Sequence, residues 1–311
     1  MSAKNFILSL SALLLAIAPA AFAADTGPDL TKDKVVYMIG YSHLDTQWRW
    51  SYPQVIREFI PKTLDDNIPF FEKYPSYIFN WTGANRYRLM KEYHPQDYAI
   101  LKEWIAKGRW FTAGSSWEEN DVNVPSSESL IRQILQGREY FKKEFGTESD
   151  EYMLPDCFGF PASLPSVLAH CGLRGFSTQK LVWHSANGIP FDIGVWEGLD
   201  GQSVIAALNP GNYGAKYPLD LANNPSLLDH VNYHGEHYGV YADYRYFGTG
   251  DTGGAPDEET VAWMDRCATE TNAPLHVFSA RSDQMFRDIT DAEKAKMPVY
   301  KGDLLLTEHS A

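Results

Sequence analysis

Two residues of types that bind metal ions stand two positions apart near the start of the sequence. His43 and Asp45 come just after a predicted strand at residues 34–41, whose apolar run is at residues 35–39. In an extended segment, residues two positions apart project to the same side, so both side chains can reach one cation. An imidazole and a carboxylate together suit zinc and similar divalent ions. Taken alone, however, the pair is more typical of a simple hydrogen-bonded contact at the end of a strand.

Further candidate ligands follow two later apolar runs. Asp156 comes after the run at residues 151–154, and His309 comes after the run at residues 304–307. Each residue by itself is typical of an ordinary loop or terminal position. Together with His43 and Asp45 they supply two imidazoles and two carboxylates, which is a four-ligand set suited to zinc or a similar ion.

Asp251 is a second candidate for acid–base chemistry. It lies in a glycine-rich segment at residues 248–254, where glycines allow the backbone to approach a ligand closely. The same composition is typical of a simple turn. Beside Asp156, however, Asp251 is the natural second carboxylate of a pair that cleaves glycosidic bonds.

Alternating apolar runs and helical patterns predict the elements that position these residues. Strands are predicted at residues 34–41, 77–81, 109–113, 151–154, 175–178, 204–208, 276–279 and 304–307. Helices are predicted to begin at Ser51 and to cover residues 98–105, 130–145, 165–170 and 260–268. Residues 209–250 are predicted to form a long loop region with short helices. Strands separated by helices indicate an α/β fold with a mostly parallel sheet, whose ligands bind at the carboxyl ends of the strands.

Composition narrows the class of protein. The chain has 311 residues, 44% of them hydrophobic, and a formal net charge of −13. This is enough apolar material for a packed core, and an acidic chain is a poor partner for nucleic acid. The aromatic content suits sugar stacking and an ordinary core equally well. The three cysteines, an odd number without Cys-x-x-Cys spacing, are predicted to be small buried residues rather than a disulfide framework.

The N-terminus has the pattern of a secretory signal peptide. Lys4 precedes an apolar run, and Ala21-Phe22-Ala23 offers small residues at the two positions that a signal peptidase reads. We therefore expect residues 1–23 to be removed and the mature protein to be secreted or periplasmic in a bacterium. The apolar run is short for a transmembrane helix, and no later run is long enough to predict a membrane span.

An ordered set of motifs resembles glycoside hydrolase family 38, the class II α-mannosidases. The principal matches are His43-Leu44-Asp45-Thr46-Gln47-Trp48, Trp117-Glu118-Glu119-Asn120-Asp121, Asp156-Cys157-Phe158-Gly159, Gly250-Asp251-Thr252-Gly253-Gly254 and Glu308-His309. Each motif is loose, but their order is specific, and the resemblance covers roughly residues 34–311. It implies a seven-stranded, β/α barrel-like catalytic domain with surrounding helices.

The resemblance also implies a role for each motif residue. Zinc would be bound by His43, Asp45, Asp156 and His309. Asp156 would also be the nucleophile, and Asp251 the general acid and then the general base, so that the anomeric configuration is retained. Terminal α-mannosides of a mannose-containing oligosaccharide would be the substrate, contacted by Trp48, Phe158 and Lys180.

Two departures from the family pattern leave other functions open. Asp251 is followed by Thr-Gly-Gly-Ala-Pro rather than standing in an unbroken glycine run, and the chain ends two residues after His309. Family members continue with a helical bundle and β-rich domains, so residues 24–311 are expected to form an incomplete catalytic domain. The alternatives are a metal-dependent polysaccharide deacetylase, and an inactive remnant that binds sugar or metal without turnover.

Overall fold

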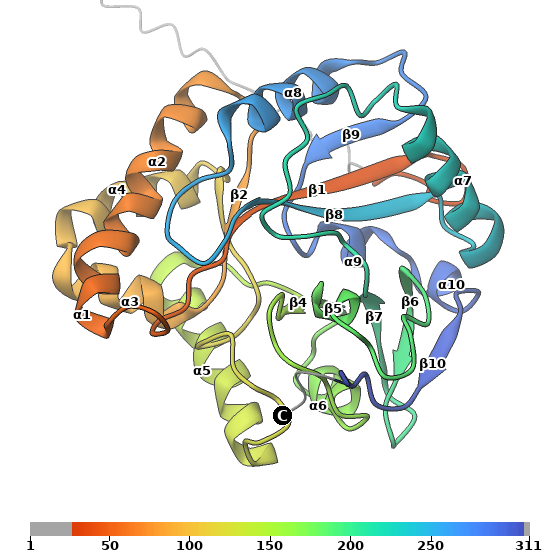
Figure 1. Ribbon diagram of the computed structural model, residues 1–311, viewed down its shortest axis with the longest axis horizontal. Coiled ribbons are helices and arrows are strands. Elements are labelled where there is room, and N and C mark those ends of the chain that lie inside the picture. The colour runs from red at the N-terminus through yellow and green to blue at the C-terminus, as the bar shows by residue number, and fades with distance from the viewer. Residues whose placement is uncertain (1–26, 308–311) are drawn as a thin grey trace, which may run out of the picture.

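The computed structural model describes residues 27–307 of the chain (Figure 1). The predicted signal peptide at residues 1–23 and the candidate ligand His309 lie outside the described residues. Within them, every helix is too short or too polar to cross a membrane.

Five parallel strands form the first sheet, with β1 at its centre. They are β1 (Val35–Ser42), β2 (Phe79–Trp81), β3 (Trp110–Thr112), β8 (Ala242–Thr249) and β9 (His276–Ser279). On one side, β8 pairs with β1 along its full length. On the other side, β9 pairs with the first half of β1 and β2 with the second half, while β3 pairs with β2. The carboxyl ends of these strands therefore lead toward a common edge of the sheet.

The second sheet also contains five strands. In spatial order they are β10 (Val299–Lys301), β6 (Ile193–Glu197), β7 (Ser203–Ala207), β5 (Gly175–Ser177) and β4 (Glu151–Met153). The pair β6–β7 is antiparallel and the other pairs are parallel. The predicted α/β class with mostly parallel sheets is confirmed. The strand pairings define two separate sheets, so barrel-like closure stays a prediction.

Helices cover the outer faces of both sheets (Figure 1). Their bounds are α1 Tyr52–Gln54, the π-helical turn η1 Val55–Phe59, α2 Ile60–Lys73, α3 Ala84–Tyr93, α4 Pro95–Ala106, α5 Ser127–Phe145, α6 Leu164–His170, the 3₁₀ turn η2 Lys180–Val182, α7 Pro225–Tyr238, α8 Glu258–Thr269, α9 Gln284–Asp288 and α10 Asp291–Lys294. The helix predicted at residues 130–145 is confirmed as α5. Its N-cap Ser126 accepts a hydrogen bond from the Ser129 amide, and Gly146 ends it in the left-handed conformation.

Strand β1 is buried on both faces, and its alternating side chains join two different cores. Tyr37 and Ile39 pack inward against β7 and β8 and against residues of β4 and β6. Val36 and Met38 pack outward with helices α2, α3, α4 and α8. A third core lies between the outer face of the second sheet and helices α5 and α6. Burial on both faces explains the continuous apolar run that predicted this strand.

Two predictions of local structure are wrong. Residues 209–250 contain helix α7 and the eight-residue strand β8, which is paired along all of β1. Strand β8 was missed because Asp243 and Arg245 interrupt its apolar pattern; in the folded chain the two form an ion pair. Residues 304–307 do not form a strand of a sheet, and Leu304 and Leu306 make isolated antiparallel bridges instead.

Some predictions of strands, helix starts and cysteine burial were only partly correct. Strands β6 and β10 were also missed. Ser51 precedes the first helix as expected, without a side-chain capping hydrogen bond. All three cysteines are unpaired; Cys157 and Cys267 are buried as expected, and Cys171 is partly exposed.

Candidate active site

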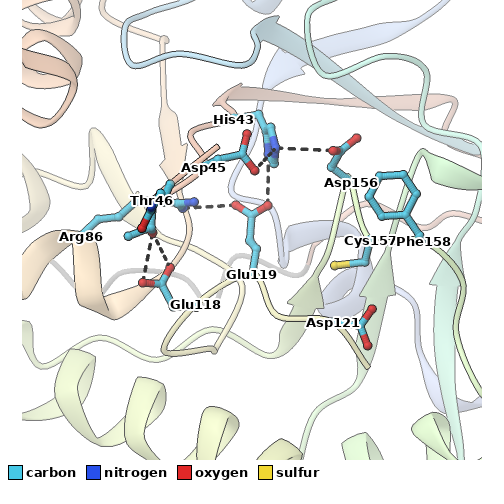
Figure 2. A pocket seen from close by; sticks show the side chains of 11 residues that line it. His43, Asp45, Thr46, Arg86, Glu118, Glu119, Asp121, Asp156, Cys157 and Phe158 are labelled. Atoms are coloured by element: carbon cyan, nitrogen blue, oxygen red, sulfur yellow. Dashed lines mark hydrogen bonds and ion pairs between the residues drawn. The ribbon is translucent and has the colours of Figure 1, made fainter. Parts of the chain in front are cut away.

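The site is centred on His43, which continues from the carboxyl end of β1. Its amide donates a hydrogen bond to the Thr249 carbonyl at the end of β8, and its ring is 3% exposed. The imidazole stacks on Tyr213, with 4.7 Å between ring centroids. Its Nε2 lies 3.6 Å from Asp45 Oδ1 and 3.8 Å from Asp156 Oδ2 (Figure 2). This buried nitrogen has no hydrogen-bond partner, although two carboxylates face it.

Glu119 holds the other side of the imidazole. Its Oε2 lies 3.2 Å from His43 Nδ1, and its Oε1 lies 3.2 Å from the buried guanidinium of Arg86. Oε1 also accepts hydrogen bonds from the hydroxyls of Tyr41 and Thr82. The buried Glu119 carboxylate is thus fixed from several directions, and it fixes the orientation of His43 in turn.

Charges around His43 change its protonation strongly. Burial lowers the pKa of His43, but Glu119 and Asp45 outweigh burial and raise that pKa to about 10. Burial likewise raises the pKa of Glu119, while His43 and Arg86 hold it well below its usual range. The imidazole therefore occupies a strongly negative environment, which favours a positive charge at this position.

Asp156 follows β4 and pairs with a buried lysine. Lys180 Nζ lies 2.6 Å from Asp156 Oδ1, and the lysine side chain is 1% exposed. The ammonium also lies over the rings of Phe158 and Trp183, at 4.2 and 3.5 Å from their centroids. Burial raises the pKa of the Asp156 carboxyl, against the opposing effects of His43 and Lys180. Lys180 thus balances the charge of Asp156 on the side away from His43.

Asp251 reaches the same place from the end of β8. Its backbone adopts a left-handed conformation, with a φ of 59°. Its Oδ1 accepts a hydrogen bond of 2.9 Å from the Tyr213 hydroxyl. His43, Asp45 and Asp251 each present one ligand atom within 4.8 Å of the others. Asp251, predicted as the acid, is therefore also placed among potential ligands.

Two adjoining cavities form the cleft. One has a volume of about 480 Å³ and is lined by His43, Asp45, Thr46, Gln47, Arg86, Glu118, Glu119, Asp121, Asp156, Cys157 and Phe158 (Figure 2). The other has a volume of about 490 Å³ and is lined by Asp45, Trp48, Asp156, Phe158, Lys180, Trp183, Asn212, Tyr213, Gly214, Gly250 and Asp251. Asp45, Asp156 and Phe158 line both. Every predicted site residue within the described part of the chain therefore lines one or both of these cavities. His309 lies outside the described residues.

The donor set fits a zinc ion. A buried imidazole nitrogen without a hydrogen-bond partner, facing the carboxylates of Asp45 and Asp156, is an arrangement that a divalent cation satisfies. The other ring nitrogen faces a carboxylate, as is usual for a metal-binding histidine.

Three residues of the site had no role assigned from the sequence: Glu119, Arg86 and Tyr213. The adjacent carboxylates of Glu118 and Glu119 were visible as part of a family motif. The motif did not show that the two carboxylates have different partners. Glu118 accepts hydrogen bonds from Thr46 and Asn85, whereas Glu119 turns toward His43. Tyr213 lies in the region predicted as loop.

Comparisons with known proteins show the family of the chain. The profile of the glycosyl hydrolases family 38 N-terminal domain matches residues 33–303. The chain belongs to glycosyl hydrolase family 38. It is 32% identical over 279 residues to alpha-mannosidase G of Dictyostelium discoideum, an alignment that covers 88% of this chain and 25% of that protein. The family 38 chain thus spans about a quarter of the length of such curated relatives.

Solved structures with the same fold include different activities. An alpha-mannosidase from Enterococcus faecalis V583 superimposes with a TM-score of 0.65 at 16% identity, covering 88% of this chain and 31% of its own. A putative polysaccharide deacetylase from Mycobacterium smegmatis gives a TM-score of 0.52 at 9% identity, covering 87% of this chain and 96% of its own. At these identities the likeness concerns the fold alone, so the choice of chemistry depends on the site residues.

Proposed function

We propose that this chain carries the catalytic centre of a zinc-dependent, retaining α-mannosidase that acts on terminal α-mannosides. The observation that carries the proposal is the buried His43 Nε2, which lacks a partner and faces Asp45 and Asp156 in a family 38 domain. The name of the D. discoideum relative supports mannose as the sugar. The predicted leader at residues 1–23 supports a secreted or periplasmic location.

The proposed zinc ligands are His43, Asp45 and Asp156, with His309 as the fourth from the sequence. When bound, the ion supplies a positive charge that holds and polarises sugar hydroxyls. Glu119 contributes by fixing the His43 ring with Nε2 toward the two aspartates.

In the first chemical step, an Asp156 oxygen forms a bond to the anomeric carbon while the glycosidic C–O bond breaks. Asp251 donates its proton to the departing oxygen. In the second step Asp251 takes a proton from water, whose oxygen replaces Asp156 on the anomeric carbon, so that configuration is retained. Lys180, 2.6 Å from Asp156 Oδ1, stabilises the carboxylate that must attack.

The sugar would lie against the aromatic side chains of the cleft. Trp48 is half exposed and lines the same cavity as Phe158 and Lys180. Flat rings suit the apolar faces of a sugar, and the Lys180 ammonium can donate to its hydroxyls. These three residues are therefore the proposed substrate contacts.

Two other functions stay as alternatives. A metal-dependent polysaccharide deacetylase would use similar ligands but would not need a second acid such as Asp251. Asp251 lines the same cavity as Asp156, and this pairing of two carboxylates in one cavity supports the glycosidase. An inactive sugar- or metal-binding remnant would bind zinc without turnover.

Hydrolysis of an aryl α-mannoside by the purified, zinc-loaded chain tests the proposal. We expect turnover with α-mannose as the first product, and loss of turnover when a chelator removes the metal. Unchanged turnover after metal removal would contradict the metal mechanism. Zinc binding without any hydrolysis would support the inactive remnant, and release of acetate from an acetylated polysaccharide would support the deacetylase.

A further inference from the structure

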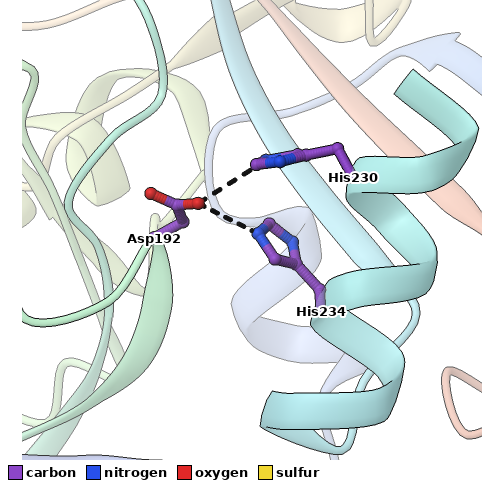
Figure 3. A group of neighbouring side chains, drawn as sticks. All are labelled: Asp192, His230 and His234. Atoms are coloured by element: carbon purple, nitrogen blue, oxygen red, sulfur yellow. Dashed lines mark hydrogen bonds and ion pairs between the residues drawn. The ribbon is translucent and has the colours of Figure 1, made fainter. Parts of the chain in front are cut away.

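A second group of histidine and aspartate side chains lies away from the cleft. His230 and His234 stand one turn apart on α7, and Asp192 immediately precedes β6. Each of the three offers one ligand atom within 4.8 Å of the others. Figure 3 shows the two imidazoles projecting from one face of the helix toward the same carboxylate. We call these three residues the α7 cluster.

Hydrogen bonding fixes the direction of the buried ring of His234. Its Nδ1 lies 2.7 Å from the carbonyl oxygen of Ala242, and because a carbonyl only accepts, Nδ1 carries the proton. In the neutral ring, Nε2 then presents a lone pair. This nitrogen lies 3.2 Å from Asp192 Oδ2, which also presents lone pairs. Two acceptors at this distance repel unless a proton or a metal cation lies between them.

The second imidazole faces the same carboxylate oxygen. His230 Nε2 lies 3.6 Å from Asp192 Oδ2, and the rings of His230 and His234 are 4.2 Å apart between centroids. The other oxygen of Asp192 accepts a hydrogen bond of 2.8 Å from the Asn209 amide. Asn209 therefore leaves Oδ2 turned toward both imidazoles. One proton can satisfy only one of these nitrogens, whereas one cation can bind both and the carboxylate.

Nearby charges favour a cation at this place. Asp243 Oδ1 lies 3.7 Å from His230 Nε2, and Asp243 Oδ2 pairs with Arg245 Nε at 2.5 Å. Asp243 thus balances the charge of Arg245. Among residues 27–307, the ion-pair partners of Asp192 are the two histidines. A cavity of about 520 Å³ borders His230, so solvent can reach this imidazole from that side.

We propose that Asp192, His230 and His234 bind a second divalent cation of the zinc class, independent of the His43 site. Two imidazoles, one carboxylate and a water are a donor set that zinc accepts, and the carbonyl bound to His234 Nδ1 is a usual outer contact for such a ligand. Helix α7 packs against both β8 and β6. The ion would therefore link α7 to the start of β6 and join the two sheets.

This site is separate from the cleft along the chain and in space. Asp243 lies near the start of β8, and Thr249 ends that strand before Asp251. The six steps between Asp243 and Thr249 correspond to roughly 20 Å at about 3.3 Å per residue. Loss of metal from the α7 cluster would consequently leave the His43 site intact.

The test is zinc titration of the chelator-treated full chain, with bound metal counted per chain after dialysis. We expect His230→Gln to lose one zinc ion per chain relative to the wild type, or to bind that ion at least about tenfold more weakly. His43→Gln should retain this ion. His237→Gln, a substitution at an exposed histidine of the same helix, is the matched control and should retain it as well.

The result that would overturn the proposal is equal zinc stoichiometry and affinity in His230→Gln and the wild type. Imidazole nitrogen NMR of the wild-type chain provides a second readout that does not depend on a variant. Zinc should shift the Nε2 signals of both His230 and His234. A His234 imidazolium whose signals ignore zinc would show that a proton alone satisfies Asp192, and would equally overturn the site.

Discussion

The cleft and the α7 cluster use the same side-chain types but are assembled differently. The cleft gathers His43, Asp156 and Asp251 from the carboxyl ends of three strands in two sheets. The α7 cluster takes two histidines from one helix and a single aspartate from the position just before strand β6. Strand ends that meet from different directions leave a hollow between them. A helix that packs on a sheet edge makes a more local contact.

The surroundings of the histidines differ as well. In the cleft, a charged and buried carboxylate, Glu119, fixes His43, and several acidic groups face one imidazole. In the α7 cluster, a neutral backbone carbonyl fixes His234. The cleft provides more carboxylates than a cation needs as ligands, and the additional ones can act as nucleophile or as acid and base. The α7 cluster provides little more than metal ligands, so we expect a cation bound there to change the free energy of unfolding rather than the rate of turnover.

The largest expected effect comes from the proposed nucleophile. Asp156→Asn removes the attacking carboxylate but keeps the side-chain shape, so we expect hydrolysis of an aryl α-mannoside to fall at least about 10³-fold. Asp229→Asn, at an exposed aspartate on α7, is the control and should keep wild-type rates. A less than tenfold loss in Asp156→Asn would give the nucleophilic role to another residue.

Glu119→Gln tests whether the charged support of His43 matters to the metal. We expect zinc affinity at the His43 site to fall by about 10–100-fold, because an outer carboxylate orients the ligand. The variant should also lose about 3–5 kcal/mol of unfolding free energy, because Arg86 stays buried without its partner. Isothermal titration and urea unfolding measure the two effects.

The neighbouring Glu118→Gln is the matched control for this experiment. Glu118 lines the same cavity but contacts Thr46 and Asn85. Its substitution should change zinc affinity much less. If both variants bind zinc equally well, Glu119 does not position His43.

Zinc binding should stabilise the fold through each site separately. At a free zinc concentration 100 times the dissociation constant, one site contributes about 2.7 kcal/mol to the free energy of unfolding. His43→Gln and His230→Gln should each lose one such contribution, and chelator should remove the rest in both. Calorimetry with and without zinc measures this, and a zinc stabilisation as large in both variants as in the wild type would place the metal elsewhere.

The smallest effect is expected at the aromatic wall of the cleft. Trp48 is 50% exposed and contacts Trp50 edge-on, so Trp48→Ala should leave the fold stable. Loss of one ring contact with the sugar should raise KM by roughly fivefold, about 1 kcal/mol. Tyr93→Ala, which removes another half-exposed ring outside the cleft, should leave KM unchanged. Equal KM values in the two variants would remove Trp48 from the substrate contacts.

The sequence predicted the cleft better than it predicted the helix-based cluster. His43 and Asp156 were selected as candidates because buried parallel strands leave clear apolar runs, and ligands collect where such runs end. Strand β8 lacks this signal, since Asp243 and Arg245 interrupt it, and the two form an ion pair with each other in the folded chain. Local periodicity cannot show such a pairing.

The α7 cluster was missed for a related reason. His230 and His234 have the spacing of neighbours on one helix face. Their region was predicted as loop, so this spacing did not predict that the two side chains lie together. Asp192 reaches them only because β6 lies beside α7. Glu119 was part of a recognised motif, but its role could not be predicted, because it lies in a loop and its partner Arg86 comes from helix α3.

Anomalous diffraction at the zinc edge, from crystals of the zinc-loaded full chain, would test the proposed metal centre without any variant. We expect a peak about 2.0–2.1 Å from His43 Nε2 that also contacts Asp45 and Asp156. A second, separate peak is predicted between Asp192, His230 and His234. A zinc-loaded crystal without a peak at His43 Nε2 would contradict the proposed metal centre and the function built on it.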